Sequence, residues 1–373
     1  MASNGFVHGN PDHPHCLVVV FLRGGADGLN MIVPVEDDGY YRHRPTISIG
    51  KKSTMALDSL FGLNSELGAL YPLYQEGDLA IVHGVGSEDE TRSHFEAQDL
   101  MEHAGPSAGG WLGRYLRTAP RVIGGPLASI CIGATQPESL RGAPASVVME
   151  SIQTLSLGEG AEGFMDGLAG LYRAEEEGIG RAGHSMLTAL RKITELQHTP
   201  YVPAAGAIYS GDDFGHGMRE VAQLLKARVG VEAVALDLHG WDSHIASFAL
   251  MNPLMRSLGD SLRAFRTDLG PQMAHTTVVV MTEFGRRVYE NASFGTDHGR
   301  GSAMMVMGGG VCGGRVHHAW KPLEDAYLEG PGDVPVTTNY RDVLASVFSR
   351  HGGLSSFESV FPGFAVAPVA LYG

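Results

Sequence analysis

Short apolar runs rich in valine and isoleucine recur along the 373-residue chain and constrain its fold more than any other feature. Such near-continuous apolarity is typical of strands that are buried on both faces, as in a parallel sheet. We therefore predict strands at residues 16–22, 79–82, 129–132, 231–236, 276–281 and 303–307.

Helical patterns separate these runs. Leucine and isoleucine recur at helical spacing over 187–196, and a second helical pattern follows Asp342 over 344–348. Because strand and helix alternate, we expect an α/β fold: a three-layer αβα sandwich around a mostly parallel sheet.

The domain organisation follows from the same patterns. Residues 1–15 form a polar segment, and residues 16–373 are expected to form a single α/β domain. Within it, residues 159–203 carry helical but few strand signals, so we interpret them as a helical insertion or cap. The acidic run at 175–177 in this insertion is interpreted as a solvated face.

Composition excludes some partners. The formal net charge of −14 argues against nucleic acid or an anionic membrane as the main partner. No apolar run approaches the roughly 20 residues that span a membrane. The sequence as it stands has no export signal and predicts a cytoplasmic protein, or a periplasmic one if a leader has been removed. It leaves the oligomeric state open.

The three cysteines, Cys16, Cys131 and Cys312, lie within or next to apolar runs, and none forms a CxxC pair. A disulfide framework is not expected in a chain of this size. We interpret all three as buried free thiols.

A glycine-rich segment with one aspartate, Asp27, follows the first predicted strand. In open parallel sheets, ligands bind beyond the carboxyl ends of the strands. A carboxylate at this point is therefore placed to bind a metal ion. The alternative is that Asp27 only caps the turn.

A helix is predicted to begin near Ser93, with Glu96 three residues later as a capping-box partner. The ordinary interpretation of Ser93 is a helix N-cap. The same position also suits a nucleophile, because the positive end of the helix dipole and the free N–H groups stabilise an oxyanion. The residues alone leave both interpretations open.

Two aspartates and two histidines lie within residues 237–244, directly after the predicted strand at 231–236. Asp242 and His244 are two residues apart, so in extended backbone they project to one side and can share one ion. Zinc, manganese and iron accept mixed carboxylate and imidazole ligands. The cluster is hard to explain as core packing and favours a metal site.

An Asp-His pair, Asp297 and His298, lies between glycines in the segment that follows the predicted strand at 276–281. Adjacent residues in extended backbone point to opposite sides, so the pair can serve two neighbouring ions. Arg286 and Arg287 precede the pair. They either hold an anionic substrate or form ion pairs with surface acids.

The order of these motifs resembles the alkaline phosphatase and sulfatase superfamily. Five segments, FLRGGADGLN, RSHFEAQD, GWDSH, TEFGRR and TDHGRGSA, are similar to those of the family DUF1501, which is usually placed in that superfamily. The resemblance runs from about Val18 to the final predicted helix. It implies an alkaline-phosphatase-like fold.

The resemblance also implies a set of metal ligands. Asp27 would be the ligand after the first strand, and Asp242 and His244 would hold one ion. Asp297 and His298 would be divided between two ions. These would be divalent cations: zinc, manganese, calcium or magnesium.

The implied chemistry is the hydrolysis of a small anionic ester. Ser93 would be the nucleophile, with Thr91 as the second choice, and would form a covalent ester that water hydrolyses. Arg92 and Arg286 complete the implied catalytic residues. The substrate would carry a phosphate or a sulfate group.

The sequence departs from the superfamily pattern in several places. Asp242 and His244 are two residues apart, where four is common, and only His317 or His318 is available as a last histidine ligand. The sulfatase signature Cys-x-Pro-x-Arg is absent, so a formylglycine nucleophile is not expected. These departures leave open a site with one metal ion or none.

Two alternatives to the hydrolase therefore remain. One is a catalytically degenerate relative that binds a ligand or partner, and the other is a phosphate-group transferase or mutase on the same scaffold. The functional interpretations rest on one expectation: carboxylates and imidazoles that are far apart in the sequence, with Asp27, Asp242 and Asp297 among them, meet in one pocket at a single edge of the sheet.

Overall fold

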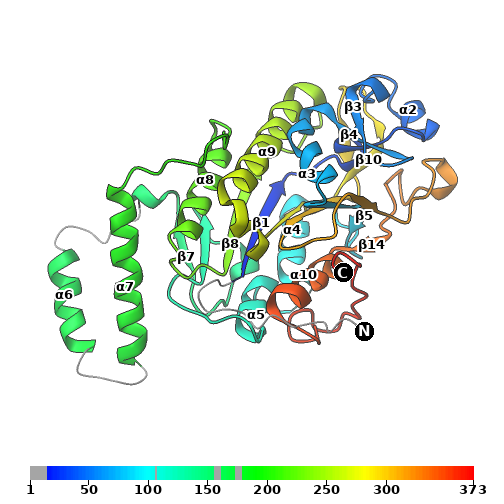
Figure 1. The fold of residues 1–373 in the computed structure, drawn as a ribbon. Coiled ribbons are helices and arrows are strands. Elements are labelled where there is room, and N and C mark those ends of the chain that lie inside the picture. Colours follow the sequence, from blue (N-terminus) through cyan, green and yellow to red (C-terminus); the bar gives the residue numbers. More distant parts are fainter. Residues whose placement is uncertain (1–14, 106, 155–160, 173–178) are drawn as a thin grey trace, which may run out of the picture.

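A nine-stranded sheet forms the centre of the computed structural model, which describes residues 15–105, 107–154, 161–172 and 179–373. The strand order is β13-β5-β12-β9-β1-β8-β6-β7, with β14 also paired to β5 (Figure 1). The strands are β1 (Cys16–Arg23), β5 (Leu79–Gly86), β6 (Ser129–Ile132), β7 (Val147–Met149), β8 (Ala233–His239), β9 (Thr276–Met281), β12 (Ser302–Gly308), β13 (Arg315–His317) and β14 (Thr338–Asn339).

Each of the six predicted strands is present, and the mostly parallel sheet is confirmed. β12 runs antiparallel to both of its neighbours, β5 and β9, while the other pairings in the described sheet are parallel. β5 continues four residues beyond its predicted end, because residues 83–86 still pair with β12 and β14.

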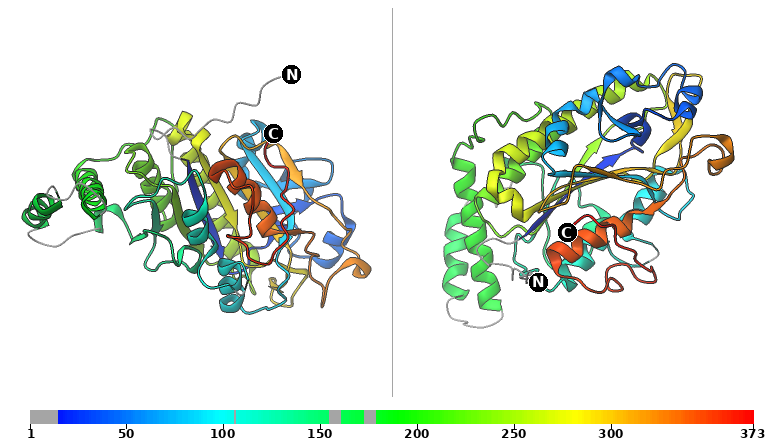
Figure 2. Two further views of the ribbon diagram at one scale, coloured as in Figure 1. Left: turned by 90° about the horizontal axis from the view of Figure 1, so that it is seen from below. Right: turned by 45° about the vertical axis from the view of Figure 1, so that its right-hand side comes forward.

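Helices cover both faces of the sheet, which gives the predicted three layers. Val18 and Val20 of β1 pack into one core, and Val19 and Phe21 pack into the other. Figure 2 shows α9 and α10 on opposite faces of the sheet. The first core also contains side chains of α3 (Tyr71–Gln75), α8 (Asp213–Lys226) and α9 (Ser247–Leu269), and the second those of α4 (His94–His103), α5 (Trp111–Thr118) and α10 (Tyr340–Gly352).

Short elements that the apolar pattern did not predict surround the carboxyl end of β1. They form a three-stranded sheet of β2 (Ile32–Pro34), β4 (Phe61–Asn64) and β3 (Thr54–Ala56), and a two-stranded sheet of β10 (Arg286–Glu290) and β11 (Thr296–His298). The remaining short helices are α1 (Gly28–Met31), α2 (Asp38–His43), η1 (Lys51–Ser53), η2 (Ser65–Leu70), η3 (Glu138–Leu140), η4 (Ile152–Thr154), η5 (Gly270–His275) and η6 (Asp325–Tyr327).

The predicted helical insertion is a pair of helices, α6 (Ala161–Tyr172) and α7 (Ile179–His198). Ala189 and Ile193 of α7 join the main core, but the pair projects from the β7 side of the body (Figure 1). It lies far from β10 and therefore does not cover that end of the sheet as a cap. The acidic run at 175–177 lies outside the described residues.

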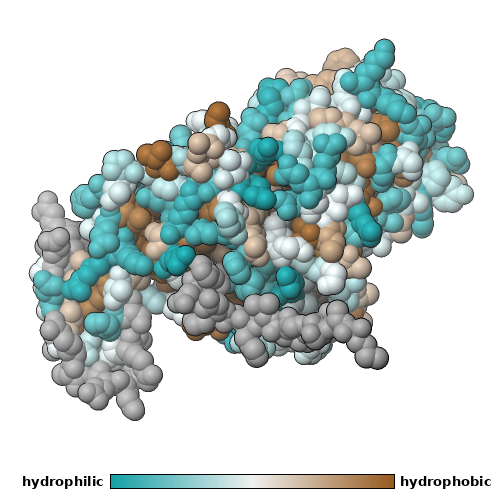
Figure 3. Space-filling model, viewed as in Figure 1, coloured by the Kyte–Doolittle hydropathy of each residue, from teal (hydrophilic) through white to brown (hydrophobic). Residues whose placement is uncertain are grey.

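The described helices include none that is both long enough and apolar enough to cross a membrane. On the face shown in Figure 3, apolar residues are scattered among hydrophilic ones.

The expectation that all three thiols are buried is wrong for Cys312. Cys16 and Cys131 are buried, and burial raises the pKa of both thiols, that of Cys131 to about 12. Cys312 is exposed, because it lies in the loop that follows the glycines after β12. In this loop the side chain of its neighbour Val311 is buried instead.

Three histidine rings lie together at the amino-terminal edge of the sheet. From their burial we predict that the free energy of unfolding falls in mild acid. The ring of His15 contacts those of His275 and His351, and burial lowers the pKa of His351 to about 3 and that of His15 to about 4. Unfolded histidine titrates near pH 6.5, so below that value the unfolded chain binds more protons than the folded one. Arg121 and Arg350 oppose protonation further.

The free energy of unfolding should therefore be fully retained above about pH 6.5 and decrease as the pH falls toward about 4. Urea unfolding curves measured across this range would test the slope. The variant His351→Gln should flatten it, and an unchanged slope in that variant would contradict the assignment.

Candidate metal centre

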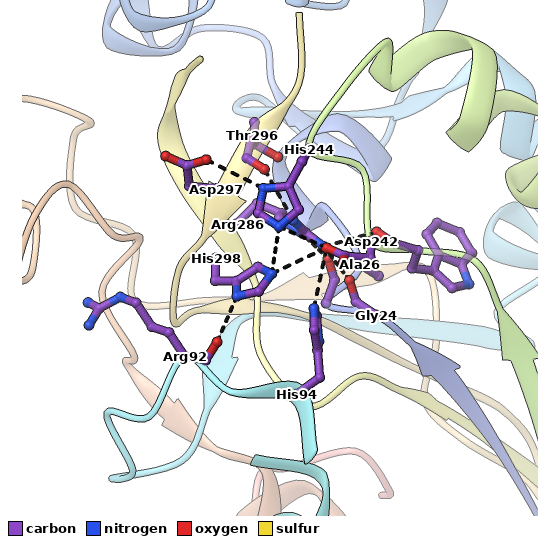
Figure 4. Close-up of polar contacts among 12 residues, drawn as sticks. Gly24, Ala26, Arg92, His94, Asp242, His244, Arg286, Thr296, Asp297 and His298 are labelled. Carbon is purple, nitrogen blue, oxygen red and sulfur yellow. Dashed lines mark hydrogen bonds and ion pairs between the residues drawn. The ribbon is translucent and has the colours of Figure 1, made fainter. Parts of the chain in front are cut away.

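A cluster of histidines and carboxylates lies at the carboxyl edge of the sheet, where the loops after β5, β8 and β9 meet (Figure 4). His94 is the first residue of α4, Asp242 lies in the loop after β8, and His298 ends β11. One ligand atom from each of these three residues lies within 4.8 Å of the others. Carboxylate and imidazole groups at this spacing can hold a single divalent ion.

Asp242 is the centre of the cluster. Its Oδ1 lies 3.3 Å from His94 Nε2, 3.2 Å from His298 Nε2 and 3.1 Å from His244 Nε2. Arg286 Nη2 donates to the same oxygen at 2.7 Å. Burial opposes ionisation of Asp242, but this hydrogen bond and the guanidinium charge outweigh it and hold the pKa well below its usual range.

A hydrogen bond on the side away from Asp242 fixes the orientation of the His298 ring. His298 Nδ1 donates to the backbone carbonyl of Arg92 at 2.7 Å, so in the neutral ring Nε2 carries the lone pair toward Asp242. His94 Nε2 is shielded from solvent, and it faces Asp242 Oδ1 at 3.3 Å. A shielded ring nitrogen beside a carboxylate and a second imidazole fits a metal site, so the residues present fit a divalent ion of the zinc or manganese type.

Arg286 differs from its expected role as a substrate-binding group. Its side chain is fully buried, and Nε donates to the carbonyl of Gly25 at 2.6 Å. Nη1 donates to the carbonyl of Thr296 at 3.1 Å, and Nη2 donates to Gly24 as well as to Asp242. The N–H groups of Arg286 thus connect the loop after β1 to β11 and hold the carboxylate of Asp242 in place.

His244 and Asp297 form a second layer on the exposed side of the cluster. His244 Nε2 lies 2.8 Å from His298 Nε2, and its Nδ1 lies 3.4 Å from Asp297 Oδ1. Asp297 also contacts Arg287 at 3.5 Å and accepts from Asn291 at 3.3 Å. The predicted ligands Asp242, His244 and His298 are therefore together, and Asp297 lies behind His244.

Asp27 is not part of this cluster, contrary to the expected meeting of three aspartates. It is buried, and its Oδ2 accepts from Arg44 Nη1 at 2.6 Å. Gly24, at φ +120°, begins a sharp turn after β1, and a Cβ there would lie 2.5 Å from the backbone nitrogen of Asp242. The turn brings the backbone against Asp242 and directs the Asp27 side chain to the buried Arg44.

Ser93 is the N-cap residue of α4, as predicted, and its side chain is exposed. The predicted capping box is wrong: Ser93 makes no side-chain cap hydrogen bond, and Glu96 accepts instead from Thr91 Oγ1 at 3.0 Å. Arg92, which lies between Thr91 and Ser93 in the sequence, donates a hydrogen bond to Asp333 at 2.5 Å. Ser93 directly precedes His94 and so lies next to the candidate ligands.

His317 and His318 lie at the edge strand β13 and just after it, away from the cluster. They line a separate cavity of about 580 Å³ with Asp58 and Tyr74, and the ring of His318 contacts Phe61. Neither belongs to a group of ligand atoms found among the described residues.

The sequence interpretation missed His94 and Glu283. His94 is part of the RSHFEAQD segment, and Glu283 of the TEFGRR segment. The sequence did offer one signal for His94, because a histidine directly follows the predicted N-cap residue Ser93. Glu283 offered none, because a single glutamate at a strand end has many ordinary explanations.

A second group of ligand atoms, from Asp99, His103 and Glu138, lies on α4 and η3. Asp99 and His103 have i, i+4 spacing, which the sequence could have shown. A cleft of about 510 Å³ beside His94 is lined by Asp99 and Glu138 and by Phe95, whose side chain is exposed. The cleft offers space for part of a ligand next to the cluster.

The fold and the site define an α/β protein with a histidine–carboxylate cluster at the carboxyl edge of a mostly parallel sheet. The model of the family described as "Protein of unknown function (DUF1501)" matches residues 179–354. This range includes Asp242, Glu283 and His298, and it is the part of the chain over which the family model agrees with the motifs quoted above.

No curated protein sequence matches the chain. A protein in the alkaline phosphatase superfamily from Vibrio parahaemolyticus is similar in structure at 9% identity and a TM-score of 0.41, covering 91% of this chain and 67% of that one. The lipoteichoic acid synthase LtaP from Listeria monocytogenes is similar at 9% identity and a TM-score of 0.40, covering 95% and 76%. The C-terminal periplasmic domain of EcEptC from Escherichia coli, in complex with Zn, matches at 9% identity and a TM-score of 0.38, covering 81% and 74%.

Proposed function

We propose that this protein is a metal-dependent hydrolase of phosphate or sulfate esters. The observation that carries the proposal is the meeting of His94 Nε2, Asp242 Oδ1 and His298 Nε2 within 4.8 Å, from three segments far apart in the sequence. The resemblance of the motifs to the alkaline phosphatase and sulfatase superfamily supports a tetrahedral ester as the substrate class.

His94, Asp242 and His298 would hold the ion. When bound, a divalent ion would supply Lewis-acid stabilisation to an ester oxygen. His244 is half-exposed, and its Nδ1 faces Asp297, which leaves Nε2 toward the cluster. This arrangement supports a role for His244 in exchanging a proton with the substrate.

Ser93 is the preferred nucleophile. Its hydroxyl is exposed, makes no cap hydrogen bond, and lies at the positive end of the α4 dipole. Thr91 Oγ1, the second choice, donates to Glu96 and accepts from the backbone nitrogen of Ser93. The hydroxyl of Thr91 is therefore already engaged, which supports Ser93 over Thr91.

The proposal is tested with 4-nitrophenyl phosphate and 4-nitrophenyl sulfate as probes. We expect release of 4-nitrophenol that requires added zinc or manganese and is abolished in His298→Ala. Ser93→Ala should lose the activity, whereas the exposed serine variant Ser59→Ala should retain it. Full activity in Ser93→Ala would overturn the nucleophile assignment, and metal binding without turnover of either ester would favour a ligand-binding relative.

A further inference from the structure

We propose that Glu283 is a positioning residue that fixes the tautomer of His94, so that Nε2 of His94 is available to a metal ion. The inference deepens the proposed function and rests on it where metal binding is concerned. Glu283 lies directly after Thr282 at the end of β9 and has no exposed side-chain surface.

Glu283 Oε1 is the acceptor of three hydrogen bonds. It accepts from the backbone nitrogen of Gly24 at 2.9 Å, from Gln98 Nε2 at 2.8 Å and from His94 Nδ1 at 2.8 Å. Its Oε2 accepts from Thr282 Oγ1 at 3.0 Å. The carboxylate is thus held from three directions and cannot move away from the His94 ring.

Both ring nitrogens of His94 face a carboxylate, but at different distances. Nδ1 lies 2.8 Å from Glu283 Oε1, whereas Nε2 lies 3.3 Å from Asp242 Oδ1. The neutral ring has one proton to donate, and the shorter contact places it on Nδ1, which leaves the lone pair on Nε2.

The arrangement has the order carboxylate, histidine, metal. An outer carboxylate of this kind fixes the ring orientation and raises the basicity of the ligand nitrogen, and its loss typically costs roughly 10- to 100-fold in metal affinity. His298 is oriented in the same way by a backbone carbonyl, which no side-chain substitution removes. Of the two outer hydrogen-bond partners, only Glu283 can be removed by a side-chain substitution, so its effect on His94 can be tested directly.

The test compares Glu283→Gln with the wild-type protein in two measurements. In metal-free protein at alkaline pH, nitrogen-15 NMR of the imidazole groups should show His94 with Nδ1 protonated in the wild type. In Glu283→Gln the signal should shift toward the Nε2-protonated form, which is the commoner one for free histidine. The dissociation constant for zinc, measured by calorimetry, should rise roughly 10- to 100-fold.

Glu232→Gln is the matched control. Glu232 is also a buried glutamate that accepts from backbone nitrogens, those of Ile123 and Gly124, but it lies at the opposite edge of the sheet, before β8. This variant should lose stability without a change in zinc affinity or in the His94 signal.

Three results would overturn the inference. They are an Nε2-protonated His94 in the wild type, an unchanged His94 signal in Glu283→Gln, and an unchanged zinc dissociation constant in that variant. The wild-type spectrum tests the inference even if Glu283→Gln fails to fold. Absence of zinc binding in the wild type, with His94 protonated on Nδ1, would contradict the proposed function and leave the tautomer assignment standing.

Discussion

In the variant Asp242→Ala, metal binding and ester hydrolysis should both fall below detection. Asp242 Oδ1 is the atom that His94, His244 and His298 approach together, so its removal takes the only carboxylate out of the three-ligand group of the described residues. The loss should exceed the roughly 10- to 100-fold that removal of an outer partner costs. Zinc calorimetry and the rate on 4-nitrophenyl phosphate measure the two effects.

Asp297→Asn provides the matched comparison. Asp297 touches the cluster through His244 Nδ1 at 3.4 Å and lies outside the three-ligand group. Its replacement should reduce metal affinity and rate by roughly 10- to 100-fold and leave both measurable. A greater loss in Asp297→Asn than in Asp242→Ala would show that the metal centre has been assigned to the wrong carboxylate.

The variant Arg44→Met should lower the free energy of unfolding by about 3–5 kcal/mol. Arg44 and Asp27 are both buried, and Arg44 also donates to Asn30 and to the backbone carbonyls of Arg287 and Val288. Without the guanidinium, Asp27 becomes a buried carboxylate with no counter-charge. Urea unfolding at neutral pH measures the loss.

Arg256→Met is the control for this prediction. Arg256 forms an ion pair with Glu66, but its side chain is more than half exposed, so its removal should cost less than about 1 kcal/mol. In the double variant Asp27→Asn, Arg44→Met, part of the stability should return because the buried charge is gone. Equal losses in Arg44→Met and Arg256→Met would contradict the account of the Asp27 pair.

The layered fold could be predicted because strands that are buried on both faces have near-continuous apolar sequences. The strands β1, β8 and β9 each contain an apolar run of at least four residues, and each lies in the middle of the sheet. The antiparallel direction of β12 could not be predicted, because a strand buried on both faces has the same composition in either direction. The small sheets of β2, β3 and β4 and of β10 and β11 have strands of three to five residues, too short for a periodicity.

The sequence indicated three of the candidate ligands that lie together, Asp242, His244 and His298, and it missed His94. Asp242 and His244 are two residues apart and do lie together. His94 and Glu283 are 189 residues apart, and their contact depends on the packing of α4 against the end of β9. The sequence also gave no signal that Arg44 would be a buried cation, and in the structure it is Arg44 that the Asp27 carboxylate contacts.

The central claim is that His94, Asp242 and His298 together bind one divalent ion. The most direct measurement is zinc content and zinc affinity of protein purified without chelator, for the wild type and for the double variant His94→Ala, His298→Ala. We predict one zinc equivalent per chain that the double variant loses. A wild type that binds no zinc or manganese, or a double variant that binds zinc as tightly as the wild type, would contradict the claim.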